Sequence, residues 1–228
     1  MVVIGIPLKY SRLEDGRNIL YLNERLRRTV QKAGGFILPI VQVQDVDYCD
    51  TRYKDLKELT KKEKEQVEEY LNLVDGVILP GGHKITHYDE YVLERCIEKN
   101  IPTLGICLGM QLMSCNGEEF KVYPNESSIN HFQESDEGTS HIVKIKKDSK
   151  LYEILKKEEL EVNSFHNYHV LINNNYIITA TSSDNYIEAI ELKEQKFHIG
   201  IQWHPEIDYE ENLDSKKLMD TFIEECKK

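Results

Sequence analysis

The segment "IPTLGICLGMQLMS" (101–114) joins two apolar runs through a turn in which a cysteine stands between two glycines. The first run predicts a buried strand and the second a short helix. Gly105, Cys107 and Gly109 have the G-x-nucleophile-x-G spacing of a nucleophile elbow, in which glycines make room for a sharp strand-to-helix turn. At a helix N-terminus the dipole favours the thiolate, the reactive form of cysteine. A buried structural cysteine beside close-packed glycines is the other interpretation that this motif alone allows.

The chain before this turn alternates short apolar runs with amphipathic helices. A helix over 60–74 is predicted to begin with a capping box formed by Thr60 and Glu63. Such an alternation predicts a parallel sheet with helices on both faces. Further helices are expected over 19–35 and 91–100, and strands over 1–6, 36–40, 101–106 and within 75–82, where the strand runs into a glycine loop.

The chain after residue 120 has shorter runs with alternating faces, which indicates antiparallel strands added to the same sheet. These strands are expected over 141–146, 176–182, 186–192 and 197–203, with a last helix over 215–228. The predicted fold is a single α/β domain over 1–228, with an open, mostly parallel sheet, helices on both faces and antiparallel additions. The long segment 41–59 is expected to be a lid or rim loop, or else a variable surface connection.

Composition excludes several classes of function. The 228 residues include 40 acidic and 29 basic ones, a net charge of −11, and no basic patch suited to nucleic acid. No apolar run approaches the roughly 20 residues of a membrane span, and the first apolar stretch is too short for a signal peptide, so a cytoplasmic protein is expected. The five cysteines lack C-x-x-C spacing, which argues against a disulfide scaffold or a structural zinc site.

A second motif, "GIQWHPEI" (200–207), supplies a candidate base for Cys107. His204 and Glu206 are two residues apart, so in extended chain both side chains leave the same face. The carboxylate can then orient the imidazole and stabilise its charged form, which completes a Cys-His-Glu triad. A loop held by a His-Glu salt bridge is the alternative when this motif is taken alone.

A third motif, "ILPGGHK" (78–84), places two glycines at the carboxyl end of a predicted strand. Open α/β sheets bind their ligands at that edge. The backbone N–H groups of Gly82 and Leu108 are therefore candidates for an oxyanion hole, in which each donor is worth about 3 kcal/mol in the transition state. An isolated Pro-Gly-Gly is otherwise a plain turn.

The Pro-Gly-Gly loop, the G-x-C-x-G-x-Q elbow and the late His-Pro-Glu, in this order, resemble the class I glutamine amidotransferase superfamily, which has a flavodoxin-like fold. Within it the chain looks like the gamma-glutamyl-gamma-aminobutyrate hydrolase family from end to end. The stretches that carry this resemblance are "YLNERLRRTVQKAGGFILPI", "LVDGVILPGG", "IPTLGICLGMQLM", "VNSFH" and "IGIQWHPE".

The resemblance implies hydrolysis of an amide at a glutamyl side-chain carbonyl. Cys107 would attack as the thiolate, and the N–H groups of Gly82 and Leu108 would hold the oxyanion. His204, steadied by Glu206, would protonate the leaving amine. Water would then release glutamate from the thioester without any metal or organic cofactor.

The resemblance also implies where the substrate binds, and three departures from the family pattern leave the amine side open. Asn167 and Tyr168 stand where the family usually has His-Gln, and Lys84 stands where it commonly has aspartate. The glycine-rich segment that often follows the nucleophile helix is only faintly echoed in 116–126. The implied substrate-binding residues are Gln111, Asn163, Ser164, Phe165 and His166.

Other functions are weighed against this hydrolase. His166 and His169 are three residues apart, but they lack a third ligand at a suitable spacing, so no metal site is expected. The chain could be a glutaminase subunit that takes glutamine and passes ammonia to a partner synthetase, although its N-terminal half resembles the free-standing hydrolases more. A binding module that lost turnover is disfavoured by the intact triad. The expected partner is a small-molecule gamma-glutamyl amide or glutamine, and a homo-oligomer stays open.

Overall fold

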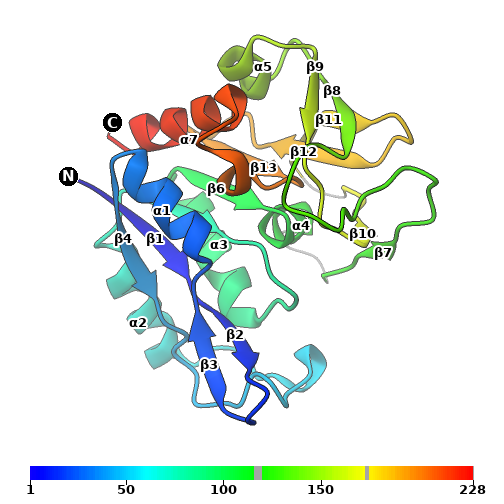
Figure 1. The fold of residues 1–228 in the computed structure, drawn as a ribbon. Coiled ribbons are helices and arrows are strands. Elements are labelled where there is room, and N and C mark those ends of the chain that lie inside the picture. Colours follow the sequence, from blue (N-terminus) through cyan, green and yellow to red (C-terminus); the bar gives the residue numbers. More distant parts are fainter. Residues whose placement is uncertain (116–119, 173–174, 228) are drawn as a thin grey trace.

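A nine-stranded sheet organises the computed structural model, which describes residues 1–115, 120–172 and 175–227 (Figure 1). Five neighbouring strands are parallel: β4 (Gly35–Ile40), β1 (Val2–Pro7), β5 (Gly76–Leu79), β6 (Thr103–Ile106) and β13 (His198–Ile201). Four antiparallel strands continue the sheet: β12 (Ile187–Glu191), β11 (Ile177–Ser182), β8 (His141–Ile145) and β9 (Glu159–Val162). The predicted α/β fold, with a mostly parallel sheet and antiparallel additions, is confirmed.

Helices cover both faces of the sheet, and each face has its own hydrophobic core (Figure 1). The first core packs the sheet against α1 (Glu24–Lys32), α5 (Lys150–Leu155) and α7 (Leu213–Glu225), and the short α6 (Pro205–Asp208) lies between α1 and α7. The second core packs it against α2 (Lys61–Leu71), α3 (His87–Glu98) and α4 (Leu108–Ser114). Burial of apolar surface on both faces is the main stabilising contribution to such a sheet.

The helix predicted over 60–74 forms largely as its sequence indicates. Thr60 is the N-cap of α2, and its hydroxyl accepts a hydrogen bond from the Glu63 N–H while the Glu63 carboxylate accepts one from the Thr60 N–H. Val67 and Leu71 are buried on one face of α2. Capping and periodicity therefore fix this helix locally.

The strand predicted over 197–203 has a second partner that the sequence did not predict. β13 pairs antiparallel with β12, as expected, but it also pairs parallel with β6, with His198 opposite Thr103. It is therefore the last strand of the parallel half, next to the strand that ends at Cys107. A strand buried on both faces has the same composition in either orientation, so the sequence could not distinguish the two.

The helix expected over 19–35 is shorter than predicted. Residues Asn18–Tyr21 form β3, which pairs with β2 (Lys9–Arg12) as an antiparallel hairpin. Asn23 then caps α1, because its side chain accepts a hydrogen bond from the N–H of Arg25 at 2.8 Å. This hairpin extends from the carboxyl end of β1 and becomes part of the functional site (Figure 1).

The remaining elements are small. Segment 41–59 contains only the short 3-10 helix η1 (Tyr53–Asp55), and β7 (Tyr123–Pro124) pairs with β10 (Tyr168–His169). Of the segment 116–126, residues 116–119 lie outside the described residues. Within the described part of the chain, the helices are all too short or too polar to cross a membrane.

Candidate active site

Cys107 occupies a strained turn between β6 and α4. Its backbone has φ 51° and ψ −104°, a conformation that costs a non-glycine residue about 1–3 kcal/mol and is found at functional sites. The flanking glycines explain how the turn fits. A Cβ on Gly109 would collide with the backbone carbonyl of Leu79, and one on Gly105 would collide with the backbone of Gly109. The nucleophile elbow is therefore present in the structure, and only glycine fits at these two positions.

His204 and Glu206 lie directly after β13, the strand beside the elbow. The ring Nδ1 of His204 is 2.8 Å from Oε1 of Glu206. Glu206 lies in the first turn of α6, which begins with Pro205, rather than in extended chain as the spacing argument assumed. The side-chain amide of Asn163 holds the backbone of His204 on both sides, since it donates to the His204 carbonyl and accepts from the His204 N–H, each at 2.9 Å.

The charges around His204 favour its protonated form. Burial disfavours a charged ring, but the negative charges of Glu206 and Cys107 outweigh it, and the pKa of His204 lies well above its usual value. Cys107 lies beside the ring, since both residues line the same cavity. Because Nδ1 faces Glu206, Nε2 is the nitrogen left for a partner on the other side. The arrangement thus favours an imidazolium next to Cys107.

Glu206→Gln is expected to move the alkaline limb of the pH–rate profile. The carboxylate is the largest influence that raises the pKa of His204, so without it burial dominates and that pKa falls. Loss of the imidazolium proton then occurs at lower pH, and the alkaline limb of kcat/KM shifts down by about 1 unit or more. Glu210→Gln is the control, because that exposed carboxylate pairs with Lys32 on the surface. An unmoved alkaline limb in Glu206→Gln would show that this carboxylate does not set the charge of His204.

The Pro-Gly-Gly loop lies against the elbow. A Cβ on Gly81 would lie 3.0 Å from Cε1 of His204, and one on Gly82 would lie 3.3 Å from Cδ2 of Leu108. The loop backbone after β5 and the N-terminus of α4 therefore come together beside Cys107. This is the placement that an oxyanion hole made by the N–H groups of Gly82 and Leu108 requires.

A cavity of about 280 Å³ opens beside Cys107 and is lined by His204 and Glu206. Phe165 forms one wall, with its ring edge-to-face against His204 at a centroid distance of 5.7 Å. Phe132 continues this wall and packs edge-to-face on Phe165 at 6.2 Å. Cys107, His204 and Glu206 thus line one pocket, which is large enough for a small molecule.

Of the five residues expected to bind substrate, only Phe165 lines this cavity. The Gln111 amide is buried and donates to the Tyr168 carbonyl and to Gln202, each at 3.2 Å. The Ser164 hydroxyl is buried and donates to the carbonyl of His131 at 2.8 Å. Asn163 holds the backbone of His204, and His166 lies in a buried cluster of histidines. These four side chains make contacts within the protein and do not line the cavity, so their contact with substrate stays a prediction.

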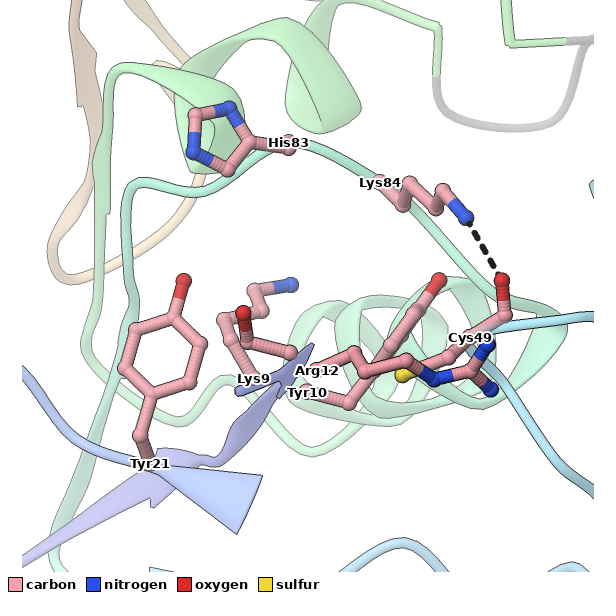
Figure 2. A pocket seen from close by; sticks show the side chains of 8 residues that line it. Lys9, Tyr10, Arg12, Tyr21, Cys49, His83 and Lys84 are labelled. Atoms are coloured by element: carbon pink, nitrogen blue, oxygen red, sulfur yellow. Dashed lines mark hydrogen bonds between the residues drawn. The ribbon is translucent and has the colours of Figure 1, made fainter. Parts of the chain in front are cut away.

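A second cavity, of about 240 Å³, adjoins the first and shares Lys9, Tyr21 and His83 with it (Figure 2). Lys9 is buried and paired with Asp89 at 2.9 Å. The other walls carry two more cations, Arg12 and Lys84. Lys9 and Arg12 were not predicted as site residues because the β2–β3 hairpin was not predicted, and residues 19–21 of its second strand were assigned to a helix.

The cations of this second cavity differ in how they are neutralised. Arg12 pairs with Asp50 at 2.7 Å, through the segment 41–59 that the sequence offered as a rim loop. Lys84 instead donates to the backbone carbonyl of Cys49 at 3.3 Å (Figure 2). Among the described residues Lys84 therefore has no direct ion pair, although its charge acts on the carboxylate of Asp50.

Fold and site together define a glutamine amidotransferase-like α/β protein with an elbow cysteine. The family model for Peptidase C26 matches residues 87–206, just over half of the chain, and this range contains both the elbow and His204. The chain belongs to the Peptidase C26 family.

Individual relatives agree with this assignment. The glutamine amidotransferase-like protein YvdE of Lactococcus lactis is 30% identical, over 69% of this chain and 77% of its own length. The CTP synthase of Bacteroides fragilis is 30% identical over 62% of this chain, which spans only 32% of that protein. Among solved structures, the glutaminase domain of a Trypanosoma brucei CTP synthase, with bound acivicin, has a TM-score of 0.66 at 19% identity, covering 100% of this chain and 94% of that one. This last likeness concerns the fold.

Proposed function

We propose that the protein is a cysteine-dependent hydrolase that cleaves a gamma-glutamyl amide to glutamate and an amine. The observation that carries this proposal is the His204–Glu206 pair at 2.8 Å, which lines the same cavity as the elbow residue Cys107. A poised thiolate, a base with an orienting carboxylate and a nearby pair of backbone donors are the parts that acyl transfer needs.

The first half-reaction forms a glutamyl thioester. The thiolate of Cys107 attacks the side-chain carbonyl carbon, and the oxyanion is stabilised by the N–H groups of Gly82 and Leu108. The C–N bond breaks as the imidazolium of His204 gives its proton to the leaving amine. The ring is then neutral and ready to act as a base.

The second half-reaction returns the enzyme to its starting state. Neutral His204 takes a proton from water, the hydroxide adds to the thioester carbonyl, and the C–S bond breaks to release glutamate. The products are a thiolate on Cys107 and an imidazolium on His204, so protons balance over the cycle. Both half-reactions use only groups of this chain.

The second cavity suggests which amine leaves. It adjoins the triad cavity through Lys9, and Lys84 lines it with its ammonium bonded to a carbonyl and without an ion pair among the described residues (Figure 2). A leaving amine that carries a carboxylate would be attracted to this cation. The preferred substrates are therefore gamma-glutamyl derivatives of an amino acid.

Lys84→Glu is expected to raise KM about 10-fold for gamma-glutamyl amides of amino acids, because reversal of one nearby charge costs about 1.4 kcal/mol. Since Lys84 does not touch the reacting atoms, kcat should change little. For a gamma-glutamyl amide of an uncharged alkylamine KM should stay the same. Lys54→Glu makes the same charge change at an exposed position of η1 that does not line the cavity. Equal effects of Lys84→Glu on both substrates would contradict this assignment of the cavity.

The CTP synthase relatives favour a second candidate, a glutaminase that supplies ammonia to a synthetase. A panel assay of the purified chain with glutamine and several gamma-glutamyl amides separates the two. The hydrolase proposal expects turnover of at least one amide with kcat/KM of about 10⁴ M⁻¹s⁻¹ or more, and preference for it over glutamine. A chain that is silent on every amide, but releases ammonia from glutamine once a partner synthetase is added, would establish the second candidate instead.

A further inference from the structure

A buried cluster of metal-ligating side chains lies outside the triad. His131, His141 and Glu188 each offer one ligand atom, and these three atoms lie within 4.8 Å of one another. The three side chains are only 2%, 5% and 1% exposed. They come from the loop before β8, the first residue of β8 and the strand β12, so three separate segments meet here.

The distances within the cluster fit a single small cation. Oε1 of Glu188 is 3.1 Å from Nε2 of His141 and 3.4 Å from Nδ1 of His131. A fourth donor, Nε2 of His166, lies 3.2 Å from Nδ1 of His131 and 3.7 Å from the same Glu188 oxygen. Ligands of a tetrahedral zinc ion, with bonds of about 2.0–2.1 Å, are about 3.3 Å apart.

Hydrogen bonds around the cluster orient the imidazole rings. Nε2 of His131 is 2.9 Å from Oδ2 of Asp184, and Nδ1 of His166 is 2.9 Å from the carbonyl of Tyr168. Nδ1 of His141 is 3.3 Å from the carbonyl of Asn130. Each outer nitrogen thus faces an oxygen that only accepts, so it carries the proton, and metal-bound histidines are held in this way.

Nε2 of His141 shares one hydrogen bond with Oε1 of Glu188, at 3.1 Å. The inner nitrogens of His131 and His166 converge on the same carboxylate oxygen, at 3.4 and 3.7 Å. Acceptors that converge without a shared proton repel each other, and a cation relieves that repulsion. The second oxygen of Glu188, Oε2, is buried and has no hydrogen-bond partner among the described residues. The cluster is therefore better satisfied with a metal ion than without one.

We propose that His131, His141 and Glu188, with His166 as the fourth ligand, bind one divalent transition-metal ion, of which zinc suits this nitrogen and oxygen set best. This site differs from the His166–His169 pair considered from the sequence. The Nδ1 atom of His169 is not among the donors that converge, and its ring stacks on Tyr186 instead. The site is structural, because all of its ligands are buried protein side chains.

A metal at this site would hold one wall of the active-site cavity in place. His131 precedes Phe132 and His166 follows Phe165, the two aromatic residues that form this wall. The two segments are already joined by a hydrogen bond from the His166 N–H to the His131 carbonyl at 2.8 Å. A metal bound to both histidines would hold the aromatic wall against His204.

Metal content and cobalt spectroscopy of the full-length Cys107→Ala chain test the proposal, since this variant removes the catalytic thiol as a competing ligand. After expression without a metal-affinity tag, we expect about one zinc per chain. After chelation and addition of Co²⁺ alone, we expect the intense visible bands of tetrahedral cobalt without a thiolate charge-transfer band. A folded chain that binds neither ion at one equivalent, or a spectrum with thiolate ligation, would overturn the proposal.

Variants in the same background locate the ion. His141→Ala and Glu188→Gln are expected to weaken Zn²⁺ binding at least 100-fold, and Asp184→Asn, which acts through His131, by about 10- to 100-fold. His169→Gln, a neighbouring histidine outside the ligand set, should bind as tightly as the parent. Circular dichroism confirms that each variant is folded. Folded His141→Ala and Glu188→Gln variants that keep the parent's affinity would place the metal elsewhere and refute this site.

Discussion

Cys107→Ala is expected to lower kcat by about 10⁴-fold or more, the largest loss of any single substitution. The thiolate forms the covalent intermediate, and no other group of the site replaces it. Steady-state release of glutamate from a gamma-glutamyl amide measures the loss. Cys115→Ala is the matched control, because Cys115 ends α4 and its sulfur contacts the backbone of Lys121 rather than the cavity.

The two cysteine variants also decide between interpretations of the elbow. Cys107→Ala should keep its fold, since the substitution removes only a sulfur from a turn that Gly105 and Gly109 make possible. Cys115→Ala should retain full turnover. An active Cys107→Ala, or a Cys115→Ala variant that loses activity while it stays folded, would remove Cys107 from the mechanism.

His204→Asn is expected to lower kcat nearly as much as Cys107→Ala. Glu206→Gln should lower kcat less, because loss of an orienting group slows the reaction less than loss of the base that it orients. The double variant of Cys107→Ala and His204→Asn should be no slower than the worse single variant, because residues that act as one unit lose activity non-additively.

The test is a double-mutant cycle, in which the rates of the two single variants and the double variant are each measured with one gamma-glutamyl amide. Asn163 supplies a comparison, since its amide holds the His204 backbone from both sides. Asn163→Ala should lower kcat less than His204→Asn does. Effects of Cys107→Ala and His204→Asn that add in the double variant would mean that the sulfur and the imidazole act in separate steps.

The sequence predicted the local structure around Cys107 and His204 well because its signals are local. The strand-turn-helix at Cys107 needs its glycines within a few residues, and Glu206 follows His204 closely enough to reach it from a helical turn. The capping box at Thr60 is local in the same sense. Each of these motifs marks a local backbone conformation that few other residue types allow.

The substrate side could not be predicted because long-range packing determines it. Lys9 reaches the cavity only because the β2–β3 hairpin forms, and its charge is tolerated there because Asp89, 80 residues away, pairs with it. Gln111 is a predicted substrate ligand from its place in the motif, yet its amide donates to Gln202, 91 residues away. A motif gives the residue type and spacing, but not which way a side chain turns.

The histidine cluster shows the same limit more clearly. His131, His141, His166 and Glu188 have no regular spacing, and they meet only when β8 and β12 take their places in the antiparallel half of the sheet. Sequence reasoning depends on spacing to find metal sites. A site assembled from two loop residues and two strand residues has no such signature.

The most direct measurement of the central claim is intact mass spectrometry of the protein, quenched with acid during turnover of a gamma-glutamyl amide. We expect a transient adduct with the mass of one glutamyl group, carried on the peptide that contains Cys107 and absent from Cys107→Ala. Turnover without any adduct on Cys107, or with the adduct on one of the other four cysteines, would contradict it.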